Sequence, residues 1–168
     1  AQAGGAPQDE PTPEQVAQAL ADLRERTRAE PDNPEAWAML AQALRMTNDL
    51  PGALDAYGKA VAQSPRNARL LAEFAETQAA ASRGDFRGKP LQLLEQAIGI
   101  APDDPKVLAL MGAARYRLGE PEVALVHLRK LRALLPAGSE QAGHIDSVIQ
   151  RISSEAASAK GGPGPMAK

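Results

Sequence analysis

Residues 37–65 read WAMLAQALRMTNDLPGALDAYGKAVAQSP, and this stretch decides the fold. Large and small apolar side chains alternate in it at helical spacing, first at Trp37, Leu40, Ala41 and Leu44, then at Ala53, Tyr57 and Ala60. A small residue is needed where two helices cross, because a larger side chain there would force the helices apart. The stretch therefore predicts an antiparallel helix pair that packs closely through Ala41 and Ala53.

Prolines repeat along the chain with a nearly constant period. They are spaced by 34, 37 and 34 residues and stand at Pro31, Pro65, Pro102 and Pro136. Each follows a stretch with helical periodicity, where a proline ends a helix without breaking it. Short turn segments follow the first three prolines and contain natural helix N-caps at Asn33, Asn67 and Asp104. Pro34 and Pro105 then fall at the first helical position, where a missing N–H costs nothing.

The pattern of residues 37–65 recurs in the two later periods. The third period carries it at Leu108, Met111, Gly112, Ala124, Leu128 and Leu131. The second period carries it at Leu71, Phe74, Ala75, Leu94 and Ala97, with three extra residues in the loop Ser82-Arg83-Gly84-Asp85-Phe86-Arg87-Gly88-Lys89. Three helix pairs are therefore expected, with Gly112 and Ala124 at the crossing of the third.

Single helices are expected on both sides of the three pairs. An apolar stripe of Val16, Ala19, Leu20 and Leu23 belongs to a helix that begins near Thr12 and Pro13. Ser139 is placed to cap a last helix with Ala142, Ile145, Val148, Ile149 and Ile152 on one face. Such a helix covers the open apolar end of a repeat stack. We expect eight helices in one domain over residues 12–158, with disordered tails at residues 1–11 and 159–168.

This recurring pattern resembles the tetratricopeptide repeat (TPR) signature. That signature is a large residue, then a large and a small one, then Ala-x3-aromatic and a terminal proline, and residues 37–65 come close to it. The resemblance implies an all-α TPR superhelix made of three repeats, an incomplete N-terminal repeat helix and a C-terminal capping helix.

The inner wall of such a superhelix is lined mostly by the first helix of each pair. Once the core positions are assigned, the remaining stripe mixes methionine, leucine and tyrosine with charges of both signs. This surface suits an amphipathic helix or an extended peptide from another protein. The alternative for the charged members is a merely solvated helix face. The candidate peptide-binding residues are Met39, Gln42, Met46, Arg69, Glu73, Glu76, Leu110, Tyr116 and Arg117.

Composition argues against several other classes of function. The charges balance at 19 basic and 21 acidic residues, which gives no basic surface for nucleic acid. The chain has no cysteine, so zinc–thiolate and disulfide chemistry are excluded, and no apolar run approaches the ~20 residues needed to cross a bilayer. Neither the distant pair His127 and His144 nor the groove pair Glu73 and Glu76 has the pattern of a metal or acid–base site. We expect no enzymatic activity and no cofactor.

From Pro31 to Ile152 the chain also resembles the periplasmic repeat domain of cytochrome c maturation proteins of the CcmI/CycH/NrfG type. The likeness rests on three segments in order. They are Gly88-Lys89-Pro90-Leu91-Gln92-Leu93-Leu94-Glu95-Gln96-Ala97, then Asp103-Asp104-Pro105-Lys106-Val107-Leu108-Ala109-Leu110, then Leu134-Leu135-Pro136-Ala137-Gly138-Ser139-Glu140.

The resemblance implies a periplasmic holdase that binds the C-terminal helix of apocytochrome c and presents the client to the haem lyase components of cytochrome c maturation. It also implies a parent protein anchored in the inner membrane by a segment that is not in this sequence, with no membrane insertion by the present chain. The alternative is a structural TPR scaffold that holds a constitutive partner in another envelope or secretion complex.

Overall fold

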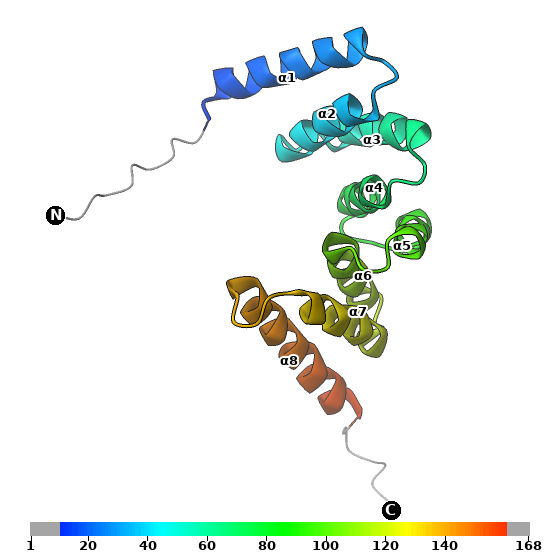
Figure 1. The fold of residues 1–168 in the computed structure, drawn as a ribbon, viewed down its shortest axis with the longest axis vertical. Coiled ribbons are helices and arrows are strands. Elements are labelled where there is room, and N and C mark those ends of the chain that lie inside the picture. The colour runs from blue at the N-terminus through cyan, green and yellow to red at the C-terminus, as the bar shows by residue number, and fades with distance from the viewer. Residues whose placement is uncertain (1–10, 161–168) are drawn as a thin grey trace, which may run out of the picture.

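A computed structural model describes residues 11–160, and within this range the chain forms eight α-helices and no strand (Figure 1). The all-α prediction is confirmed. The helices are α1 (Pro13–Ala29), α2 (Pro34–Met46), α3 (Leu50–Gln63), α4 (Ala68–Ala81), α5 (Lys89–Ile100), α6 (Pro105–Arg117), α7 (Pro121–Leu134) and α8 (Glu140–Lys160).

The helices are arranged as a stack of pairs. The tightest packing is within the pairs α2/α3, α4/α5 and α6/α7, and each pair also packs on its neighbour. Figure 1 shows the pairs following one another down the molecule, with α1 at one end and α8 at the other. This is the predicted TPR superhelix of three repeats with a single helix at each end.

Helix N-caps define where the repeats begin, as the sequence predicts. The side-chain oxygens of Asn33, Asn67 and Asp104 accept hydrogen bonds from the first backbone amides of α2, α4 and α6. Thr12 forms a capping box with Gln15 at the start of α1, and Ser139 Oγ accepts from the Ala142 amide in α8. These bonds satisfy amides that would otherwise lack partners, so each helix starts at a defined residue.

Small residues lie at the helix crossings. Ala41 and Ala53 are fully buried between α2 and α3, beside the fully buried Tyr57. In the third repeat, a Cβ placed on Gly112 would lie 2.9 Å from the Cδ2 atom of Leu128, closer than packed carbon atoms approach. The spacing between α6 and α7 therefore depends on the absence of a side chain at position 112.

The long α4–α5 loop is fixed to the core by Phe86, whose side chain is buried against α4 and α5. Arg83, Gly84 and Gly88 adopt positive φ there, so the three-residue insertion is taken up by tight turns. At the C-terminus α8 continues through Ala159 and Lys160, two residues beyond the domain boundary predicted at 158. Of the two predicted tails, residues 1–10 and 161–168 lie outside the described residues.

Candidate functional site

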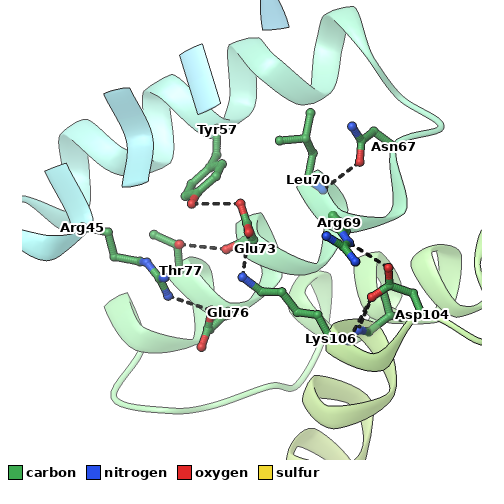
Figure 2. A network of polar contacts seen from close by, with 11 residues as sticks. Arg45, Tyr57, Asn67, Arg69, Leu70, Glu73, Glu76, Thr77, Asp104 and Lys106 are labelled. Carbon is green, nitrogen blue, oxygen red and sulfur yellow. Dashed lines mark hydrogen bonds and ion pairs between the residues drawn. The ribbon is translucent and has the colours of Figure 1, made fainter. Parts of the chain in front are cut away.

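The first helices of the three repeats are joined across their inner faces by an inter-repeat network, formed by Arg45, Tyr57, Arg69, Glu73, Glu76, Asp104 and Lys106 (Figure 2). Arg45 of α2 contacts Glu76 of α4 at 2.6 Å. Lys106 of α6 contacts Glu73 of α4, also at 2.6 Å. Each of these ion pairs connects one repeat to the next.

Burial strengthens the centre of this network. The Glu73 side chain is only 19% exposed and accepts from the Tyr57 hydroxyl at 3.3 Å as well as from Lys106. Burial raises the pKa of Tyr57, and the neighbouring Glu73 carboxylate raises it further, so the hydroxyl stays protonated and donates. A carboxylate this buried is held by two donors because an unpaired one would be costly.

Asp104 has two roles at the junction of α5 and α6. Its carboxylate accepts from the amides of Lys106 and Val107 and from Arg69 Nε, which lies 2.7 Å away. Burial acts to raise the pKa of Asp104, but the hydrogen bonds from Arg69 and the two amides outweigh it and hold the pKa below its ordinary value.

The candidate residues Arg69, Glu73 and Glu76 all belong to this network. In this structure their charges are used between repeats, so a ligand would have to exchange partners with them. The residues predicted on α2 are placed differently. Met39 is 46% exposed and Met46 is 81% exposed, and Gln42 is exposed between them on the same helix. These three residues form a mixed apolar and polar face of α2 that is open to solvent.

A second candidate surface is an α6–α8 cleft that has α7 as its floor. One part, of about 600 Å³, is lined by Pro105, Lys106, Ala109, Leu131, Leu135, Glu140, Gln141, His144 and Ile145. An adjoining part, of about 370 Å³, is lined by Ala109, Gly112, Ala113, Tyr116, Arg117, Leu128, His144, Ile145, Val148, Arg151 and Ile152. Ala109, His144 and Ile145 line both parts, so the two form one cleft.

The cleft exists because α8 packs on α7 and makes much less contact with α6. Ile152 of α8 is buried against Leu125 and Leu128 of α7, which fixes one wall on the floor. The facing side of α6 carries only the small residues Ala109, Gly112 and Ala113 between its charged ends. At the far end, the Tyr116 hydroxyl donates to the Glu155 carboxylate and joins the two walls.

The structure brings together only some of the predicted site residues. Tyr116 and Arg117 line the α6–α8 cleft, whereas Leu110 lies in a smaller hollow between α4 and α6 that Glu76 and Arg117 also line. His144 and Ile145 also line the cleft but are not among the site residues that the sequence predicts. Their signal was the apolar stripe of the last helix, but where that stripe meets α6 depends on tertiary packing.

Little in the described chain points to chemistry. Residues 11–160 contain no group of three or more histidine, cysteine, aspartate or glutamate side chains that could hold a metal ion. His127 is half-buried on α7, and its pKa is lowered by burial and by the charges of Arg115 and Lys130. In this same range, no helix combines the length and apolar character needed to span a bilayer.

Stacked helix pairs with a cleft on their inner face define a TPR domain, a class whose members typically act as protein-interaction scaffolds without enzymatic activity. Residues 2–142 match the family described as the cytochrome c-type biogenesis protein H TPR domain. The chain belongs to this family. Membership supports a role in binding other proteins and suggests a periplasmic or membrane-associated location.

Solved structures show the same fold. A thermophilic TPR protein of Thermus thermophilus is 22% identical, with a TM-score of 0.67 over 84% of this chain and 75% of that one. A MamA crystal structure is 20% identical, with a TM-score of 0.60 over 70% of this chain and 67% of its own. A MamA double mutant is 18% identical, with a TM-score of 0.62 over 86% and 89%. Comparison with curated proteins gives no match.

Proposed function

We propose that this domain is a periplasmic holdase that binds the C-terminal helix of apocytochrome c and presents the client to the haem lyase components of cytochrome c biogenesis. The observation that carries the proposal is the family match over residues 2–142 together with the cleft on the inner face of the stack. The parent protein would be anchored in the inner membrane.

The inner face has the properties that a helical client requires. The α6–α8 cleft is mostly apolar and is bordered by charges, as are grooves that hold amphipathic helices. The exposed Met39 and Met46 of α2 extend an adaptable apolar surface toward the other end of the stack. In this proposal Leu110, Tyr116 and Arg117 contact the client directly, while Arg69, Glu73 and Glu76 contribute through the inter-repeat network.

The absence of cysteine from the sequence fits a client that carries reactive thiols. Apocytochrome c exposes a Cys-x-x-Cys-His segment, and a holdase with thiols of its own could form mixed disulfides with it. A cysteine-free surface holds such a client without competing for the sulfur atoms that haem attachment needs.

Calorimetric titration with a synthetic C-terminal helix of an apocytochrome c tests this function. We expect a saturable heat with a dissociation constant in the micromolar range or tighter. Ordering the peptide in an exposed groove costs entropy, which limits how tight the binding can be. A scrambled peptide of the same composition serves as the control and should bind much more weakly. The absence of any heat at high micromolar peptide would contradict the proposal and leave the scaffold alternative, which a pull-down of a constitutive partner from envelope extract would then identify.

A further inference from the structure

The border of the α6–α8 cleft carries two arginines that take part in no ion pair of the described chain. Arg117 at the end of α6 and Arg151 on α8 are both exposed, and both line the same part of the cleft. Among the described residues, neither guanidinium makes a hydrogen bond or an ion pair. The guanidinium of Arg117 lies against Gly84 of the α4–α5 loop, where any side chain at position 84 would meet it.

Most other charges near the cleft already have partners. Lys106 pairs with Glu73, Arg132 with Asp146 and Glu155 with the Tyr116 hydroxyl. Glu140, at the opposite end of the cleft from Arg117 and Arg151, is the exception and lies near Lys106. One end of the cleft therefore carries two arginines that form no ion pair within the described residues, since the nearby Glu155 carboxylate accepts from Tyr116. The other end carries Lys106 and Glu140.

Between these ends the lining of the cleft is apolar, and the side chains on the α6 wall are small. Ala109, Gly112 and Ala113 of α6 face Ile145 and Val148 of α8, above the leucines of α7. The small residues of α6 leave room for large side chains of a bound peptide. The apolar face of that peptide would cover the aliphatic side chains of α8. The hollow between α4 and α6 is smaller, about 240 Å³, and these two helices pack directly on each other.

We propose that the α6–α8 cleft binds an acidic amphipathic helix of a partner protein, with its apolar face on α7 and its carboxylates on Arg117 and Arg151. This inference rests on the proposed function and names the part of the groove and the ligand chemistry that it uses. Arginine suits the role because its planar guanidinium binds carboxylates with two parallel hydrogen bonds. Two arginines at one end of the cleft also orient the helix, with its acidic residues toward the C-terminal end of α6 and the middle of α8.

Fluorescence anisotropy with two designed peptides tests the charge preference. Both carry leucines on one helical face, and the other face carries glutamate in one peptide and lysine in its counterpart. We expect the glutamate peptide to bind about tenfold more tightly to the whole protein. The double variant Arg117→Gln with Arg151→Gln should remove this preference. The matched control, Arg24→Gln with Arg129→Gln, removes the same charge from exposed arginines that line neither part of the cleft and should keep it.

A blocking variant tests the place of binding. Ala109→Phe fills the centre of the cleft and should abolish binding of the glutamate peptide, whereas Ala62→Phe, at an exposed position of α3, should not. Equal affinity for the two peptides, or full affinity in the double arginine variant, would overturn the inference. If a cytochrome c peptide bound the wild type and the double variant equally, this inference would fail while the holdase function stood. If the glutamate peptide bound but no cytochrome c peptide did, this inference would stand and the holdase function would fail.

Discussion

At the scale of single residues, Asp104 shows how one side chain can serve both local and long-range structure. Its carboxylate caps α6 and also binds Arg69 from the preceding repeat. Asn33 and Asn67 cap α2 and α4 through the same kind of bond but carry no charge. The negative charge at position 104 is therefore not required for capping, and its separate contribution is the ion pair between repeats.

The pH dependence of stability measures that contribution. Because the pKa of Asp104 in the folded chain is below its ordinary value of 3.8, its stabilising effect is complete above that value and is lost as the pH falls through the folded pKa. Asp104→Asn keeps the cap and removes the titrating charge, so the variant should lose less stability than the wild type between about pH 5 and pH 2. Urea unfolding across this range gives the comparison, and parallel curves for the two proteins would contradict the assignment.

At the scale of elements, the distance between two helices is decided by the smallest residue at their crossing. Gly112 is buried where α6 meets α7, with Leu128 directly over it. Gly58 in α3 has open space where a Cβ would lie. Both glycines stand inside helices, where alanine is favoured by about 1 kcal/mol. The two positions therefore share a helical backbone conformation and differ in how closely other side chains pack against them.

Gly112→Ala and Gly58→Ala should therefore shift stability in opposite directions. At position 58 alanine should raise the free energy of unfolding by about 0.5–1 kcal/mol, because it gains helix propensity without a clash. At position 112 the new Cβ would displace the buried Leu128, and a loss of up to about 2 kcal/mol should remain after the propensity gain. Thermal and urea unfolding of the two variants decide the matter. Equal stabilisation by both would show that α6 and α7 can separate freely.

At the scale of the whole molecule, the domain is a stack in which each unit contacts its neighbours only. One buried cluster joins α2 and α3 around Tyr57, and another joins α7 and α8 around Ile152. A third, larger cluster lies between them and includes Leu94 and Met111. Stability in such a stack is close to a sum over units and their interfaces, so damage at one end is expected to remain local.

Hydrogen exchange on two variants tests this locality. Ile152→Ala leaves a cavity between α7 and α8, which should cost about 2–5 kcal/mol and speed amide exchange in those helices. Exchange in α2 and α3 should hardly change. Leu44→Ala, in the buried cluster at the other end, should give the opposite distribution. Faster exchange along the entire chain in both variants would indicate one cooperative unit instead of a stack.

The sequence by itself determined the repeat architecture, because every signal for it is local. Prolines at a nearly constant period, the caps Asn33, Asn67 and Asp104, and the small residues at helix crossings each act within one or two turns of a helix. The resemblance carried by the segments around Pro90 and Pro136 also led to the correct family. The end of α8 extended two residues beyond the predicted boundary, since nothing at position 158 stops a helix.

Only the tertiary structure decided how the inner face is used. Whether Glu73 and Glu76 point to a ligand or to the next repeat depends on the rotation between helix pairs, and that rotation places Lys106 and Arg45 within reach. The cleft beside Tyr116 depends in turn on how α8 packs against α7 through Ile152. These relations join residues some 30 or more positions apart, and helical periodicity carries no information about partners at that separation.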